Sequence, residues 1–217
     1  MEIAQKLELR LAKRAPLRFI SHHDLMRALE RAARRAALPV RRTEGFNPGP
    51  RIVLVQALPV GVCSEDEVAE IELYEWVRPA EFETRLRDAL PDGLEVIATR
   101  LLRPVRKGQA LAGAEYSVRL PEGLEISRAD IEALMAREEA FVERPRPNET
   151  KRVNVRRYIE ELSLSQGKLH MRLRTENGGL ARPEEVVAVL AGVDPTEMKG
   201  LDVVKTRTVL AAQPTGR

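Results

Sequence analysis

Residues Phe19 to Ile52 read FISHHDLMRALERAARRAALPVRRTEGFNPGPRI and decide how the first half of the chain folds. Before this stretch, Leu7, Leu9 and Leu11 alternate with charged residues, and a period of two predicts a half-buried strand. Within the stretch, apolar residues recur at helical spacing until Pro39 ends the pattern. The sequence therefore predicts a strand, an amphipathic helix and a loop rich in glycine and proline.

The alternation of strand and helix patterns continues along the chain. In the first half we expect a helix at 79–90, beginning with a proline, and strands at 40–43, 51–57, 68–73 and 94–102. Residues 103–115, RPVRKGQALAGAE, have the composition of a linker. In the second half we expect helices at 127–137 and 183–191, and strands at 116–120, 141–144, 153–164, 169–174 and 203–210.

Each half thus follows the order β-α-β-β-α-β, with an additional or longer strand in the second half. This order is a split βαβ motif, which gives an antiparallel sheet with two helices on one face. We therefore predict an α+β protein made of two tandem ferredoxin-like (β-α-β-β-α-β) units with antiparallel sheets. The first unit is expected at residues 1–105 and the second at residues 106–217.

Composition narrows the class of protein. The chain has 217 residues, of which 43% are hydrophobic and 32% charged, as in a globular protein with a real core. Its single cysteine, Cys63, excludes an internal disulfide and a zinc site built from cysteine pairs. Neither a signal peptide nor a membrane-spanning run is visible, so we expect a cytoplasmic protein without membrane contact. No pattern indicates a cofactor or a metal site.

The start of the predicted helix carries candidate chemistry. Ser21 suits an N-cap, and the Asp24 carboxylate can reach back toward it. His22 and His23 follow in the first turn, where the helix dipole disfavours their charged forms, so a neutral imidazole could act as a base. Adjacent helical residues point about 100° apart, so the two histidines cannot chelate one metal ion. The alternative is an ordinary capped turn.

Charge is distributed unevenly in the first half, although the formal net charge of the chain is only +3. A stripe of arginines opposes the apolar face of the predicted helix: Arg27, Arg31, Arg34 and Arg35. Arg41, Arg42 and Arg51 extend this basic region, whereas residues 65–95 are dominated by acids. Such a basic face suits phosphate contact, and an ordinary solvated helix face is the alternative.

The EGFNPGP segment has the features of a binding loop. Its glycines permit backbone angles that other residues avoid, and its prolines stiffen the path. We take Glu44, Phe46 and Asn47 as candidate binding residues, and expect the loop to lie near His22 and Asp24. Arg27, Arg42 and Arg51 would then border one electropositive pocket. A purely structural turn is the alternative.

A second basic cluster lies in RPRPNETKRVNVRRYIEEL, where Arg152 and Arg156 are candidate binding residues. A solvated hairpin tip explains the same residues. Because aromatic residues make up only 4% of the chain, stacking platforms for single-stranded nucleic acid must be few.

The run from Pro16 to Val62, PLRFISHHDLMRALERAARRAALPVRRTEGFNPGPRIVLVQALPVGV, resembles the signature of the radical-SAM-linked family of unknown function. The segment KRVNVRRYIEEL is also similar. The usual pattern reads SHLD followed by SEGFNPHP, and here His23, Thr43 and Gly49 replace its Leu, Ser and His. Members occur alone or attached to a radical-SAM protein, often one with a cobalamin-type domain. The resemblance therefore implies a radical-SAM protein as partner, without implying a reaction.

Three functions remain open from the sequence. The first is a non-catalytic accessory module that binds structured RNA and presents it to a radical-SAM enzyme. The second is a metal-independent RNA endonuclease of the CRISPR RNA-processing type, with His22 or His23 as general base. The third is a protein-docking domain that uses the acidic helix near Glu81 and Glu83.

Overall fold

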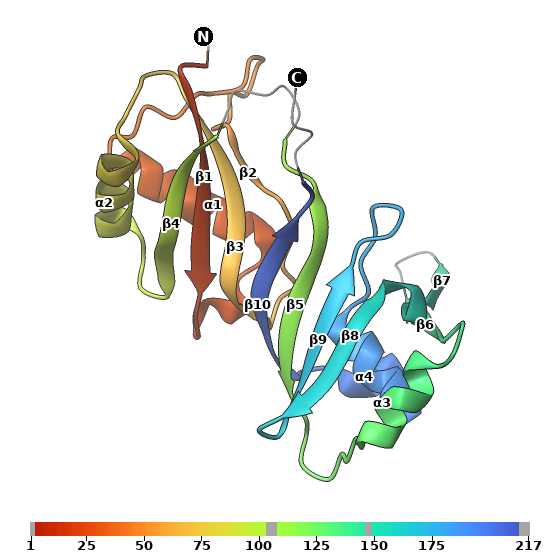
Figure 1. The fold of residues 1–217 in the computed structure, drawn as a ribbon. Helices are drawn as coiled ribbons and strands as arrows, with labels where there is room; N and C mark the ends of the chain where they lie inside the picture. Colours follow the sequence, from red (N-terminus) through yellow and green to blue (C-terminus); the bar gives the residue numbers. More distant parts are fainter. Residues whose placement is uncertain (1–2, 103–107, 146–148, 213–217) are drawn as a thin grey trace. The chain divides into compact units, whose positions relative to one another are not determined.

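The computed structural model describes residues 3–102, 108–145 and 149–212 (Figure 1). The chain divides into two compact units: unit 1 comprises Met1–Leu111 and Leu210–Arg217, and unit 2 comprises Ala112–Val209. The predicted boundary between residues 105 and 106 lies outside the described residues. The described residues form a mixed α+β protein with four α-helices and mostly antiparallel strands.

Unit 1 builds one antiparallel sheet with two helices. Its elements are β1 (Gln5–Lys13), α1 (His22–Arg35), β2 (Ile52–Leu54), β3 (Cys63–Leu73), α2 (Pro79–Ala89) and β4 (Leu94–Leu102). The strands lie in the order β4-β1-β3-β2, and each neighbouring pair is antiparallel. Both helices contribute to the core on one face of the sheet (Figure 1).

The alternation in β1 sorts its side chains between the two faces. Leu7 and Leu9 are fully buried and share one hydrophobic core with Leu29 of α1 and Phe82 of α2. Burying a leucine side chain stabilises a fold by roughly 1.5–3 kcal/mol, so these positions fix which face of β1 meets the helices. The charged residues between the leucines are left on the opposite face of the sheet.

Unit 2 contains four further sheet strands and a separate two-stranded hairpin. Its elements are β5 (Leu111–Arg119), α3 (Arg128–Met135), β6 (Phe141–Pro145), β7 (Thr150–Asn154), β8 (Ile159–Ser165), β9 (Lys168–Arg174), α4 (Pro183–Ala191) and β10 (Asp202–Leu210). The four sheet strands of this unit lie in the order β10-β5-β9-β8, while β6 and β7 pair only with each other in the described residues. The hairpin accounts for the additional strand expected in the second half.

Three expectations about single elements are wrong. The strand predicted at 40–43 is reduced to isolated bridges from Val40 and Arg42, because neighbouring prolines lack the N–H groups that a ladder needs. The strand predicted at 153–164 is two strands separated by a 3-10 turn at Val155–Tyr158. The expected linker at 103–115 is too long, since β5 already begins at Leu111. Its first part, 103–107, lies outside the described residues.

No helix in the described residues combines the length and the apolar character needed to cross a lipid bilayer.

Candidate nucleic-acid interface

Helix α1 begins with a capped first turn. The Ser21 Oγ atom accepts a hydrogen bond from the Asp24 backbone N–H at 3.1 Å and donates one to Asp24 Oδ2 at 2.7 Å. The Ser21 hydroxyl, more than any other group, lowers the pKa of Asp24 below its ordinary value. A charged carboxylate therefore lies at the positive end of the helix dipole, as the sequence predicted.

His22 and His23 occupy this first turn, and their rings meet edge to face with centroids 5.7 Å apart. His23 is exposed, whereas His22 is half-buried. The buried Nδ1 atom of His22 has no hydrogen-bond partner among the described residues, so no hydrogen bond at this atom orients the imidazole as in a general base. The described residues also contain no group of three His, Cys, Asp or Glu side chains able to hold a metal ion.

One face of α1 presents a stripe of exposed arginines, which we call the basic stripe: Arg27, Arg31, Arg34 and Arg35. The opposite face is buried in the core. Arg27 lies 3.6 Å from Asp24 with 70% of its side chain exposed, and such a surface pair contributes at most about 1 kcal/mol. Arg35 donates a hydrogen bond to the Ala89 carbonyl. Arg27 and Arg34 are about 10 Å apart along the axis, so the stripe forms an elongated track.

On helix α2, in contrast, acidic and basic side chains form ion pairs with each other. The Glu81 carboxylate lies 3.4 Å from the Arg85 guanidinium, and Glu83 lies 2.6 Å from Arg87, both one helical turn apart. Arg85 also donates to the Ala36 carbonyl at the end of α1. The acids proposed for protein docking are therefore already neutralised by arginines of the same helix.

The EGFNPGP segment forms a closed loop. The Thr43 N–H donates to the Gly49 carbonyl at 2.7 Å, and the Gly49 N–H donates to Thr43 Oγ1 at 2.9 Å. The Arg42 guanidinium donates to the Pro48 carbonyl at 2.6 Å. Gly45 has a φ of 125°, which residues with a side chain rarely adopt. These bonds leave Phe46 at the tip, fully exposed to solvent.

The expectation that this loop meets His22 and Asp24 is wrong. His22 follows β1, whose last residue, Lys13, pairs with Ser64, and we call this side of the sheet the histidine edge. The loop lies at the other side, the loop edge, where Gln5 pairs with Leu73. A backbone hydrogen bond places the start of the loop at this edge: the Arg41 N–H donates to the carbonyl of Glu72, the neighbour of Leu73, at 2.8 Å.

The physical reason is the direction of the chain. Helix α1 has 14 residues and carries the chain about 21 Å back across the sheet. The loop precedes β2 and therefore lies where β2 begins, far from the start of α1. Arg27, near the histidine edge, cannot border one pocket with Arg42 and Arg51.

Some of the remaining basic candidates near the loop pair with acidic side chains. Arg41 donates to Glu72 at 2.9 Å, and the Arg51 Nε atom lies 4.0 Å from the same carboxylate. The side chains of Arg42 and Arg51 are exposed. Glu44 is also exposed, 4.0 Å from Arg41. Asn47 is exposed within the loop.

The second basic cluster contributes mostly to the structure of unit 2. Arg144 forms a two-pronged pair with Glu185, at 2.5 and 2.7 Å, which raises the pKa of Arg144. Arg156 donates to the Met135 carbonyl at the end of α3 and to the Ile159 carbonyl. Arg152 lies over the Phe141 ring at 3.8 Å and is exposed. Arg146 lies outside the described residues.

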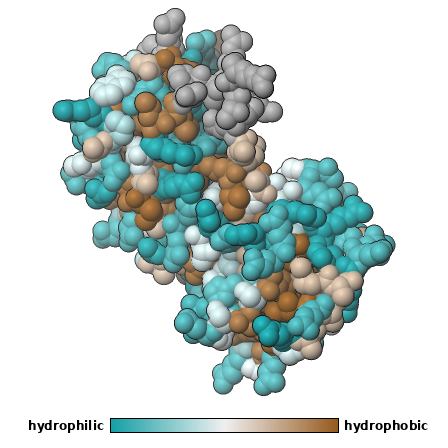
Figure 2. Space-filling view, viewed as in Figure 1, coloured by the Kyte–Doolittle hydropathy of each residue, from teal (hydrophilic) through white to brown (hydrophobic). Residues whose placement is uncertain are grey.

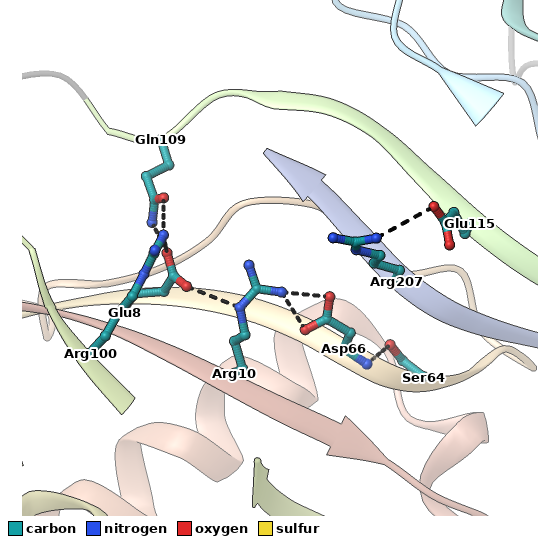
Figure 3. Close-up of polar contacts among 8 residues, drawn as sticks. All are labelled: Glu8, Arg10, Ser64, Asp66, Arg100, Gln109, Glu115 and Arg207. Carbon is teal, nitrogen blue, oxygen red and sulfur yellow. Dashed lines mark hydrogen bonds and ion pairs between the residues drawn. The ribbon is translucent and has the colours of Figure 1, made fainter. Parts of the chain in front are cut away.

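A polar network on the sheet face opposite the helices was missed from the sequence (Figure 3). Glu8 is only 1% exposed and accepts hydrogen bonds from Arg10, Arg100 and Gln109. Burial opposes its ionisation, but these hydrogen bonds outweigh burial and lower the pKa of Glu8. Arg10 in turn donates to both oxygens of Asp66, at 2.8 and 2.7 Å. The charged residues that alternate with leucine in β1 were the available signal.

Unit 2 holds a polar cavity of about 170 Å³ that the sequence also did not indicate; it is lined by Glu115, Tyr116, Glu161, Ser163, His170, Met171, Arg172 and Thr206. Arg172 donates to Glu115 at 2.7 Å, and Arg207 lies 4.0 Å from the same carboxylate (Figure 3). Glu115 and Arg172, two opposite charges that line this cavity, therefore pair with each other. On the face drawn in Figure 2, hydrophilic residues predominate and interrupt the hydrophobic areas.

The fold and the site together define an α+β protein of two units, with a basic helix exposed on unit 1. The chain belongs to the family described as uncharacterized proteins conserved in bacteria (DUF2344), whose sequence pattern matches residues 6–207. Comparison with the curated proteins finds no match. A crystal structure of an unknown protein from Galdieria sulphuraria is 17% identical, with 96% of this chain and 99% of that chain covered and a TM-score of 0.29.

Proposed function

We propose that the protein is a non-catalytic RNA-binding module whose basic stripe grips the phosphate backbone of a structured RNA. The supporting observation is the contrast between the two helices of unit 1. Arg85 and Arg87 of α2 each pair with a glutamate of the same helix. Arg31 and Arg34 of α1 are exposed, and no acid in the described residues forms an ion pair with either.

This contrast matters because counterion release drives phosphate binding. A guanidinium that already pairs with a carboxylate must break that pair before it can neutralise a phosphate. An arginine held only by water releases a condensed counterion from the nucleic acid on contact and gives salt-dependent affinity. The planar fork of arginine also matches the geometry of phosphate oxygens.

The topology of both units supports the same class of module. Numbered along the chain within each unit, the four sheet strands lie in the order 4-1-3-2, with helices after the first and third strands. We take this as the split βαβ arrangement of two ferredoxin-like units, with β6 and β7 inserted into the second. A rigid sheet under α1 holds the arginines in a fixed row for the backbone.

The test is RNA binding by filter retention at several salt concentrations. The variant Arg27→Gln, Arg31→Gln, Arg34→Gln is compared with a control that also loses three exposed arginines, Arg87→Gln, Arg119→Gln, Arg207→Gln. The wild type should lose affinity steeply with salt, and the stripe variant should reduce the slope of log K against log salt by about 2–3, because each of the three lost phosphate contacts removes roughly 0.7–0.9. The control variant should keep most of the slope.

Two outcomes would contradict the proposal. RNA retention that is absent, or unaffected by salt, would contradict binding through phosphate contacts. Equal slopes for the stripe and control variants would mean that general charge, and no particular surface, binds RNA. RNA recovered from the same samples should be intact, because His22 lacks an orienting partner in the described residues; cleavage lost in His22→Ala with His23→Ala would favour the endonuclease instead.

The resemblance of Pro16 to Val62 adds a partner to this proposal. We propose that the module presents its RNA to a radical-SAM enzyme. A tagged protein purified from its native host should co-purify with such an enzyme, and nuclease treatment of the lysate should reduce the recovery. Recovery that is unchanged after nuclease treatment would favour direct protein docking.

A further inference from the structure

We infer that the loop edge of unit 1 binds unpaired nucleobases, so that the RNA recognised is one with a loop, bulge or single-stranded end. This inference rests on the RNA-binding function proposed above and names the part of the RNA that is read. It depends on where the few aromatic side chains of the chain lie.

Low aromatic content predicted few stacking platforms, but the structure places most of these rings in solvent. Five of the eight aromatic side chains are at least 40% exposed. Three of the five belong to the loop edge: Phe46 is fully exposed, Trp76 is 61% exposed and Tyr74 is 40% exposed. Rings of this size gain strongly from burial, so their display in solvent at one edge favours a role in contact.

Backbone hydrogen bonds connect the segments that carry these rings to the same edge. Tyr74 follows the last residue of β3, and its N–H donates to the Pro39 carbonyl at 3.0 Å. Trp76 precedes Val77, whose N–H and carbonyl both bond the buried Gln5 side chain at 2.9 Å. Phe46 lies on the closed loop that reaches the edge through Arg41 and Glu72.

This construction fixes the backbone on both sides of Trp76 and Phe46. The exposed Trp76 is held between two buried residues, Leu73 and Val77, and Phe46 lies between the hydrogen bonds that close its loop. A ring on a fixed backbone loses little conformational entropy when a base stacks on it. Stacking accepts any base, because every base has a π-face.

Cations at the edge favour nucleic acid over a protein partner. Arg42 and Arg51 lie at the two ends of the loop with exposed side chains, and the basic stripe ends nearby at Arg34 and Arg35. Aromatic rings beside arginines are the combination that captures splayed bases while the phosphates are neutralised. A strand leaving the stripe would meet the rings next.

Trp76 is the single tryptophan of the chain, so its fluorescence reports on this edge alone. The wild-type protein is titrated with two RNAs of equal length, one a blunt duplex and one with an unpaired internal loop. We expect both to bind, with quenching of Trp76 emission only by the RNA with the loop. Phe46→Ala should weaken binding of that RNA by about tenfold, as for the loss of one stacked base, and leave duplex binding unchanged.

The matched control is Phe19→Ala, which removes a phenyl ring that is 64% exposed near the histidine edge and should change neither affinity. Far-UV circular dichroism confirms that each variant is folded. RNA binding that depends on the stripe but neither quenches Trp76 nor responds to Phe46→Ala would overturn this inference and leave the proposed function standing. Absence of any RNA binding would overturn both. A Phe46→Ala variant that binds RNA normally but fails to retain a protein partner would assign the edge to protein contact.

Discussion

The pair formed by Arg144 and Glu185 allows a sharp test of which basic residues serve structure. We consider Arg144→Met, Glu185→Leu and the double variant, because both replacements remove the charge and leave an apolar side chain that still fills part of the space. Glu185 is 4% exposed and Arg144 is 15% exposed. Removing either partner leaves the other charge buried without compensation, whereas removing both does not.

The expected magnitudes follow from this geometry. Breaking a buried pair costs about 3–5 kcal/mol, and the partial exposure of Arg144 places Arg144→Met at about 3 kcal/mol. Glu185→Leu should cost more, since Glu185 also accepts the Arg182 N–H at 2.9 Å. The double variant should lose only about 1 kcal/mol, the typical effect of a lost cap, whereas the two single variants together lose more than about 6 kcal/mol, so the coupling free energy should be about 5 kcal/mol or more.

Urea unfolding of the four proteins at neutral pH measures these free energies. For a chain of this size, Arg144→Met should also lower the melting temperature by about 6–12 °C. Its RNA affinity should stay unchanged at temperatures where it is folded. An Arg144→Met variant within about 1 kcal/mol of the wild type, or a double variant as unstable as the sum of the singles, would refute the reasoning.

Two further predictions concern single side chains. Burial raises the pKa of Glu184, so its ionised form opposes folding above the ordinary carboxyl pKa of 4.5. Glu184→Gln should therefore raise the free energy of unfolding at pH 7 but not below pH 4, and a constant gain across that range would contradict the assignment. Ser21→Ala should lower stability by about 1 kcal/mol through loss of the α1 cap, whereas the exposed Ser165→Ala should change it by less than about 0.5 kcal/mol. Equal effects in a thermal melt would show that the cap contributes nothing.

Local signals were sufficient for the elements whose ends are set by their own residues. The bounds of β4 and α4 are those expected, because Pro91, Asp92 and Gly93 form the turn before one and Pro183 begins the other. The turn at Val155–Tyr158 could not be foreseen, because it depends on Arg156 reaching the Met135 carbonyl, 21 residues away along the chain.

Individual features of the candidate site could be predicted from the sequence, but their positions relative to one another could not. The basic stripe follows from helical spacing, and its exposure agrees with the expected amphipathic helix. The position of the loop depends on the edge at which β2 begins, and the Gly- and Pro-rich composition of the loop is the same at either edge. The exposure of Trp76 could not be predicted from the residue type, because it depends on how the next residue, Val77, is held. Val77 is bonded by the side chain of Gln5, which lies 72 positions away in the sequence.

Helix α1 spans the distance between the two edges and therefore sets a minimum length for any ligand that contacts both of them. Its 14 residues span about 21 Å, so a ligand that reaches from the histidine edge to the loop edge must be at least that long. With about 3.4 Å of helix axis per base step, the value for a B-form duplex, this distance corresponds to roughly six base steps. Under the proposed function, oligonucleotides shorter than this should contact one edge at a time, and longer ones should bind more tightly because they can contact both edges at once.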